Sequence, residues 1–186
     1  MRVMLHACCG PCLLEPLEVL AQEHDVTVCY ANPNIAPREE YVRRRDTLLG
    51  YAESAGMPVI ELPYRPQRWR EAVAGFEDDL SRRCRACFGL RLGLTAAEAR
   101  SGGYDAIATT LTVSPYQDPD AIREAGEEVC AREGVRFLVT DFRARYAEAT
   151  RRSRELGMYR QNYCGCEPSR IEAEAERARR RASRQR

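Results

Sequence analysis

Hydrophobic and polar positions follow two alternating periodicities along the chain. Short apolar or β-rich runs predict strands at residues 2–7, 25–30, 57–62, 104–109 and 135–140. Helical spacing and composition predict helices between them, at residues 13–22, 38–55, 66–75, 84–100 and 119–132. Strands that alternate with helices are joined by right-handed crossovers and form a mainly parallel sheet. The pattern therefore predicts an α/β, doubly wound fold.

The domain organisation is simple. A chain of 186 residues with 44% hydrophobic content suits one domain with a single core, which we place at residues 1–169. Residues 170–186 form an Arg-rich C-terminal tail without apolar periodicity after Ile171, which indicates a solvated helix or a disordered end. Ligands of doubly wound folds bind beyond the carboxyl ends of the strands. We therefore expect the chemistry in the segments that follow strands.

Charge narrows the functions that are open to the chain. All 29 basic residues are arginine, which excludes Schiff-base chemistry, a lysine general base and a Walker-type phosphate lysine. Residues 177–186 hold six arginines and no acid, so the remainder carries 23 arginines, 28 acidic residues and a net charge of −5. The tail therefore suits a polyanion ligand. The sequence has neither an apolar run of about 18 residues nor a signal-peptide core, so we expect a cytoplasmic protein without a membrane partner.

Nine cysteines indicate metal or redox chemistry, since a secreted disulfide scaffold would be shorter and would follow a signal peptide. Cys8, Cys9 and Cys12 follow the first strand and precede a helix, whose N-terminus lowers a thiol pKa and favours the metal-binding thiolate. Gly10 and Pro11 bend the chain, so we expect Cys12 to return toward Cys8 and Cys9.

Two further cysteine groups occur later in the chain. Cys84-x-x-Cys87, at the expected start of a helix, lets two sulfurs face one ion or one edge of a cluster. Cys164-Gly165-Cys166 holds either two metal ligands or a small, easily reduced disulfide. The last two cysteines, Cys29 and Cys130, fall on apolar faces and are expected in the core.

Polar residues near the expected strand ends supply the other candidates. His6 lies beside the first thiols and is a catalytic candidate with Cys12, Cys164 and Cys166. Groups able to bind a nucleoside, a phosphate or an unpaired base are Asn32, Asn34, Thr109, Thr110, Ser114, Tyr116, Tyr159, Arg160 and Gln161. Turn capping explains the loop residues nearly as well.

Five separated motifs follow one another along the chain: His6-x-Cys8-Cys9-Gly10-Pro11-Cys12, Asn32-Pro33-Asn34-Ile35 with Glu40-Tyr41, Arg83-Cys84-x-x-Cys87-Phe88-x-x-Arg91-Leu92, Thr109-Thr110-Leu111 to Ser114-Pro115, and Tyr159-Arg160-Gln161-x-Tyr163-Cys164-Gly165-Cys166. From about residue 3 to residue 167 the chain resembles the cobalamin-independent, QueH-type epoxyqueuosine reductases. The motif with Tyr41 adds this residue to the substrate-binding candidates.

The resemblance implies a Rossmann-like fold related to the PP-loop (HUP) enzymes, and the last step of queuosine biosynthesis. In this step an oxidoreductase removes the epoxide oxygen of epoxyqueuosine at the tRNA wobble position, and two electrons and two protons give an alkene and water. The partners would be this tRNA and an electron donor. Local arginine clusters at residues 82–85 and 151–154 would hold the tRNA, with help from the tail.

The resemblance also assigns the thiols. A 4Fe-4S cluster would be bound by Cys8, Cys9, Cys84 and Cys87. A second metal ion, iron, would lie nearby, with Cys12 as a candidate ligand. Cys164 and Cys166 would cycle between dithiol and redox-active disulfide.

Two other functions fit part of the sequence. A non-catalytic, zinc-stabilised RNA-binding module would use four cysteines and leave Cys12, Cys164 and Cys166 without a role. A thiol-disulfide oxidoreductase would explain C-x-x-C and C-x-C but not the adjacent pair Cys8 and Cys9. Iron and labile sulfide in protein purified without oxygen would separate the reductase from both.

Overall fold

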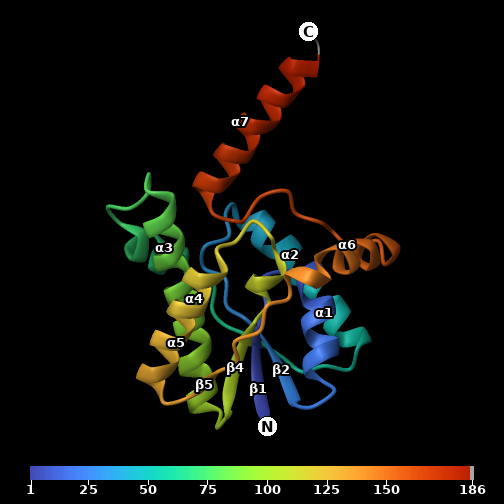
Figure 1. Cartoon of the computed structure of the whole chain (residues 1–186), viewed down its shortest axis with the longest axis vertical. Helices are drawn as coiled ribbons and strands as arrows, with labels where there is room; N and C mark the ends of the chain where they lie inside the picture. The colour runs from blue at the N-terminus through green and yellow to red at the C-terminus, as the bar shows by residue number, and fades with distance from the viewer. Residues whose placement is uncertain (185–186) are drawn as a thin grey trace.

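The computed structural model describes residues 1–184 and confirms a single α/β domain with a five-stranded parallel sheet (Figure 1). The strand order is β3-β2-β1-β4-β5. The strands are β1 (Arg2–His6), β2 (Asp25–Tyr30), β3 (Val59–Glu61), β4 (Ala106–Thr109) and β5 (Arg136–Phe137). The helices are α1 (Gly10–Leu20), α2 (Arg38–Ser54), α3 (Pro66–Val73), α4 (Leu80–Ser101), α5 (Pro119–Glu133), α6 (Tyr146–Glu155) and α7 (Glu167–Arg184).

Two apolar layers enclose the sheet because successive side chains of a strand point to opposite faces. In β1, Val3 and Leu5 pack on the side of α1 and α2, whereas Met4 packs on the side of α4 and α5. Figure 1 shows α1, α2 and α6 on one flank and α3, α4 and α5 on the other. The expected core cysteines, Cys29 and Cys130, are buried in the layer of α4 and α5.

The register of the central strands brings distant loops to one edge. His6, the last residue of β1, pairs with Cys29 of β2 and with Thr109 of β4. The chain after each strand therefore leaves the sheet at the same carboxyl edge, where α1 begins with its first turn at Gly10. A Cβ on Gly10 would lie 2.9 Å from Thr47 Cγ2, so glycine permits the close approach of α1 to α2.

Several expected boundaries were wrong. β5 covers two residues, 136–137, because the chain beyond it turns toward a 3₁₀ turn at Arg143–Arg145. α4 begins at Leu80, four residues earlier than expected, since the Asp79 carboxylate caps the helix by accepting from Arg82 N. α6 was missed because its exposed face is polar, although Ala149 packs into the core.

α7 begins at the carboxyl edge of the sheet and extends away from the domain (Figure 1). The tail expected at residues 170–186 is helical as far as residue 184, and residues 185–186 lie outside the described part. Within residues 1–184, no helix is both long and apolar enough to cross a membrane.

Candidate metal centre

Three thiols meet directly after β1. The Sγ atoms of Cys8, Cys9 and Cys12 lie within 4.8 Å of one another, close enough to bind one metal ion. Cys9 is the residue that precedes α1, and Cys12 lies in its first turn beside Pro11. The expected return of Cys12 toward Cys8 and Cys9 is confirmed. Proline suits the first turn because it has no N–H group that needs an acceptor. The other N–H groups of this turn have no acceptor within the helix, and their partial positive charge favours a thiolate.

The three sulfurs have different proton affinities. Hydrogen bonds from Cys12 and Cys9 hold the pKa of Cys8 well below its usual value, and the charge of Arg91 adds to this effect. Burial raises the pKa of Cys9, and hydrogen bonding to Cys8 raises that of Cys12. Cys8 is therefore the thiol of the three that ionises most readily. Metal binding would release the protons that the thiols still hold.

An amide donor from a distant segment reaches the same sulfurs. Gln161 Nε2 lies 2.8 Å from Cys9 Sγ and 3.9 Å from Cys12 Sγ. Thr110 Oγ1 lies 3.8 Å from Cys8 Sγ. Gln161 and Thr110, expected to contact substrate, thus contact thiols in this structure.

The other two cysteine groups lie together on the α3 and α4 side. Cys87 and Cys166 are buried in one small apolar cluster with Trp69 and Val73. Burial raises the pKa of Cys84 to about 11 and that of Cys87 to about 12, and charge on Cys164 contributes to both increases. Among the described residues, Cys84 and Cys87 fall outside the group formed by Cys8, Cys9 and Cys12. All nine cysteines are free thiols in this structure.

Cys164 and Cys166 flank a position that requires glycine. Gly165 has φ +138°, and a Cβ there would lie 3.1 Å from Arg44 Nη1 and 3.2 Å from Ile35 Cγ1. Cys166 is buried, whereas Cys164 is exposed and accepts a hydrogen bond from Gln117 Nε2 at 3.4 Å. The dense protein around Cys164 nevertheless raises its pKa, and the charge of Arg91 opposes this increase.

A buried ion pair on α2 holds this loop. Arg44 donates to the carbonyl oxygens of Cys164 at 2.8 Å and Tyr163 at 3.1 Å. Its Nε lies 2.7 Å from Glu40 Oε1, and the two side chains are 1% and 8% exposed. Tyr159, a substrate-binding candidate, donates its hydroxyl to Glu40 Oε2 at 2.6 Å. The residues before Cys164 are thus fixed to α2.

A second buried guanidinium connects α4 to the first thiols. Arg91 Nη2 donates to Asn32 Oδ1 at 2.7 Å, and Asn32 Nδ2 donates to the carbonyl oxygen of Ala7 at 2.9 Å. Asn32, expected to bind substrate, therefore supports the backbone next to Cys8. Cys84, Cys87 and Arg91 are spaced three and four residues apart and so share one face of α4.

His6 is fully buried and uncharged. Burial and the charge of Arg91 lower its pKa to about 3, so the imidazole is neutral at physiological pH. Its Nδ1 lies 2.9 Å from Thr109 Oγ1 at the end of β4, and Nε2 has no partner among the described residues. A neutral His6 supplies a ring nitrogen to the site but no proton from an imidazolium.

The other polar candidates divide by exposure. Tyr41 is buried, donates to Glu61 Oε1 and stacks on Tyr64, which is a packing role. Asn34 is buried, and its amide has no partner within residues 1–184. Tyr116 and Arg160 are exposed, and Ser114 is half-buried.

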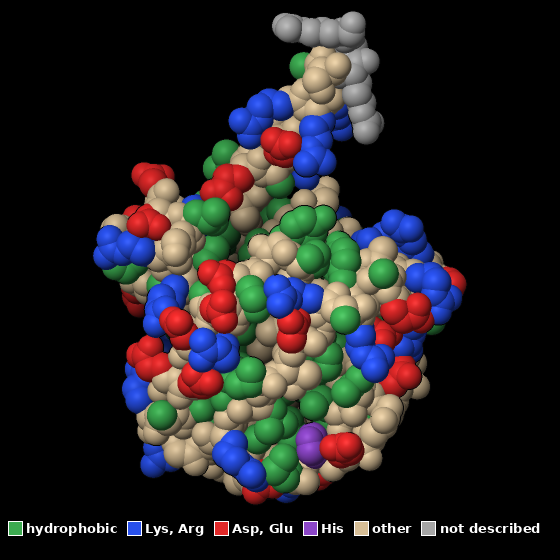
Figure 2. All heavy atoms as spheres, viewed as in Figure 1, with side chains coloured by type: hydrophobic (Ala, Val, Ile, Leu, Met, Phe, Trp, Pro, Cys, Tyr) green, Lys and Arg blue, Asp and Glu red, His purple; other side chains and the backbone are tan. Residues whose placement is uncertain are grey.

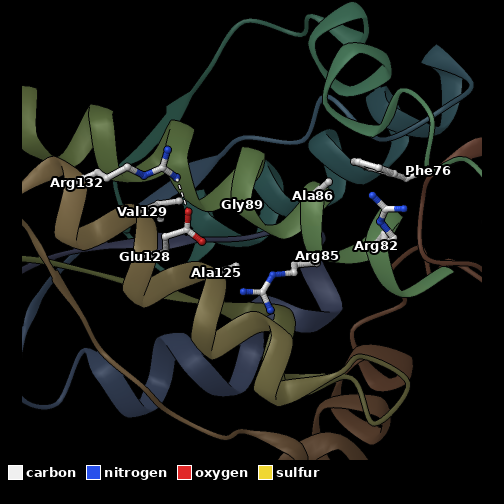
Figure 3. Close-up of a pocket in the computed structure, with 9 residues that line it drawn as sticks. All are labelled: Phe76, Arg82, Arg85, Ala86, Gly89, Ala125, Glu128, Val129 and Arg132. Carbon is white, nitrogen blue, oxygen red and sulfur yellow. Dashed lines mark ion pairs between the residues drawn. The ribbon is translucent and has the colours of Figure 1, made fainter. Parts of the chain in front are cut away.

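The expected arginine clusters are largely neutralised by carboxylates. Arg83 is buried against Glu172 of α7, and Arg85 pairs with Glu124. Arg82, Arg85 and Arg132 instead line a hollow of about 310 Å³ between α4 and α5, where Figure 3 shows the pair of Arg132 and Glu128. In α6, Arg151 and Arg152 also pair with acidic side chains. Four of the six arginines in the two clusters thus have acidic partners, and their part in holding tRNA stays a prediction.

The sequence did not indicate that Arg44, Glu40 and Arg91 are parts of the site. Arg91 and Glu40 occur inside the five sequence motifs, but nothing in the local pattern distinguishes a buried arginine from a solvated one. The spacing of Glu40 and Arg44, four residues apart on one helix, is the available signal for their pairing.

Comparisons with known proteins agree on one family. The family model for epoxyqueuosine reductase QueH matches residues 3–172. The chain is 36% identical to epoxyqueuosine reductase QueH of Thermotoga maritima over 171 residues, which cover 88% of each protein. It is 34% identical to the Dehalococcoides mccartyi protein of that name, with 89% of this chain and 90% of the relative covered.

One solved structure supports the fold. A crystal structure described as a predicted subunit of a tRNA methyltransferase from Methanocaldococcus jannaschii superposes with a TM-score of 0.54 at 12% identity. The match covers 85% of this chain and 89% of that one. Together with the family match over residues 3–172, the grouping of Cys8, Cys9 and Cys12 at the carboxyl edge shows that this chain belongs to the epoxyqueuosine reductase QueH family.

Proposed function

We propose that this protein reduces epoxyqueuosine to queuosine at the wobble position of tRNA, the last step of queuosine biosynthesis. The observation that carries the proposal is the family match, which covers nearly the whole domain. The convergence of three thiols at the carboxyl edge of the sheet agrees with it. The reaction consumes two electrons and two protons, removes the epoxide oxygen as water and leaves an alkene.

The thiols fit an iron-sulfur cofactor because soft, closely spaced cysteine sulfurs are the ligands that such clusters use. Cys8 and Cys9 would hold a 4Fe-4S cluster together with Cys84 and Cys87, and Cys12 would serve a second metal ion, iron. When bound, these metals supply one-electron transfer and Lewis acidity toward the epoxide oxygen.

The chain's own residues provide the remaining functions. Cys164 and Cys166 would hold two electrons as a dithiol and release two protons on forming a disulfide, which an external donor would then reduce. Gln117 orients Cys164, and Gln161 donates to Cys9. The exposed Arg160 and Tyr116 are available to the nucleoside.

The proposal is tested by purification without oxygen followed by assay on tRNA that carries epoxyqueuosine. We expect brown protein with iron and acid-labile sulfide, and conversion of the modified base to queuosine with a chemical reductant. Colourless protein that contains zinc would favour the structural RNA-binding module. Metal-free protein that exchanges protein disulfides would favour the thiol oxidoreductase. Either result would overturn the proposed function.

The tRNA would be held in part by an arginine face on α7. Arg170, Arg177 and Arg181 are seven and four residues apart, so they lie on one side of the helix. On another side, Ile171 and Glu172 line a hollow of about 570 Å³ with Trp69 of α3. Arg177 Nη1 donates to the carbonyl oxygen of Asn162, the neighbour of Gln161, so this end of the arginine face lies beside the segment that contacts the thiols.

Reach and charge both suit an RNA backbone. α7 has 18 residues and is about 27 Å long, so its far end can contact phosphates well away from a base held at the thiols. Arginine side chains are visible along this helix in Figure 2, and Arg179, Arg180 and Arg181 are exposed. Glu176 is the acidic partner of Arg179 and Arg180.

Changing Arg177, Arg179, Arg180 and Arg181 to glutamine will weaken tRNA binding. We expect roughly tenfold lower affinity at moderate salt, and a salt dependence that flattens by about one unit of slope for each phosphate that arginine no longer neutralises. Filter binding across a salt series measures both quantities. The matched control changes Arg123 and Arg132 of α5. Unchanged tRNA affinity and an unchanged salt slope in the α7 variant would show that the tail does not contribute to tRNA binding.

A further inference from the structure

Arg91 is a buried charge without a carboxylate partner. Its side chain is 1% exposed, and within residues 1–184 no carboxylate oxygen lies within ion-pair distance of its guanidinium. Its Nη2 donates to the neutral amide of Asn32, and its Nε has no partner in the described chain. The other two arginines that are buried in the described part of the chain differ, because Arg44 pairs with Glu40 and Arg83 with Glu172.

An uncompensated buried guanidinium costs several kcal/mol unless a negative charge lies beside it. Arginine cannot escape this cost by losing its proton, since its pKa lies far above physiological pH. The fold therefore requires an anion near Arg91. The chain offers thiolates for this purpose, because no carboxylate within the described part reaches Arg91.

The position of Arg91 brings its charge to two separate cysteine segments. It follows Cys87 by one helical turn on the same face of α4, and through Asn32 it supports the backbone of Ala7, next to Cys8. A single buried cation is thus placed one turn from Cys87 and, through two hydrogen bonds, next to the backbone that carries Cys8.

We propose that Arg91 is the fixed counter-charge of the metal centre: a positioning residue that retains the thiolate-bound metal and raises its reduction potential. The inference rests on the proposed function for the identity of the cluster. A cluster bound by thiolates is anionic and gains negative charge on reduction, so a nearby fixed cation favours the reduced form. Arg91 acts through the cysteines and does not touch the substrate.

The test compares the variant Arg91→Met with wild type in metal-free and metal-loaded protein. In the loaded protein we expect a more negative midpoint potential and iron loss to a chelator at least tenfold faster. In the metal-free protein we expect an unchanged or higher melting temperature, because a charge that needed compensation is gone. Arg91→Lys should recover part of the potential, since it restores the charge without the hydrogen bond to Asn32.

A second probe does not depend on the cluster. Titration of metal-free protein with Co²⁺, followed by its thiolate charge-transfer absorbance, should give at least tenfold weaker binding for Arg91→Met. If wild type forms no iron-sulfur cluster, the proposed function fails, while the Co²⁺ titration still decides the role of Arg91. Unchanged Co²⁺ affinity, or lower stability of the metal-free variant with an unchanged potential, would overturn the inference and leave Arg91 a packing residue.

Discussion

Replacing Cys164 or Cys166 by serine is expected to reduce turnover by about 1000-fold or more, while iron and labile sulfide stay at the wild-type level. Serine preserves the size of the side chain but cannot form a disulfide, so the two electrons of the dithiol are lost. The effect should be seen with a protein or thiol reductant, in single-turnover and steady-state assays of epoxyqueuosine tRNA.

The two cysteines have different surroundings, so their variants test different things. Cys164 is exposed and accepts a hydrogen bond from Gln117, whereas Cys166 is buried beside Cys87 and Trp69. Loss of iron from Cys166→Ser, with full iron in Cys164→Ser, would place Cys166 among the metal ligands and contradict the paired redox role. Cys130→Ala is the matched control, because this cysteine lies in the core layer of α4 and α5.

The second large effect is expected at the buried ion pair of α2. Arg44→Met leaves the Glu40 carboxylate buried without its partner and removes both hydrogen bonds to the loop before Gly165. The free energy of unfolding should fall by about 3 to 5 kcal/mol. Urea unfolding of metal-free protein measures this loss. Turnover should fall as well, because Cys164 is no longer held in place.

A double variant separates stability from positioning. Glu40→Leu with Arg44→Met removes both buried charges, so we expect stability to recover toward wild type. Turnover should stay low, because nothing replaces the donors to Tyr163 and Cys164. Recovery of activity together with stability would limit the pair to a structural role.

The local pattern of apolar and polar residues was sufficient to predict the strands and helices in which this pattern is strong. The strand at residues 25–30 and the helix starting at residue 38 appear where the sequence predicts them, because apolar runs and helical spacing are properties of neighbouring residues. The grouping of Cys8, Cys9 and Cys12 was also predictable, since five residues with Gly10 and Pro11 cannot separate the thiols far. β5 and α6 were harder to predict, because a two-residue strand and a mostly polar helix have only weak hydrophobic patterns.

The sequence by itself determined the fold class, the family resemblance and the separate cysteine groups. Only the tertiary structure decided that Gln161 contacts Cys9 across 152 residues and that Tyr159 donates a hydrogen bond to Glu40. It also decided that Arg91 is buried without a carboxylate partner within the described chain. The reason is physical. Spacing along a chain specifies local geometry, whereas the partner of a buried charge is set by which strands end at the same edge and by how the helices pack against them.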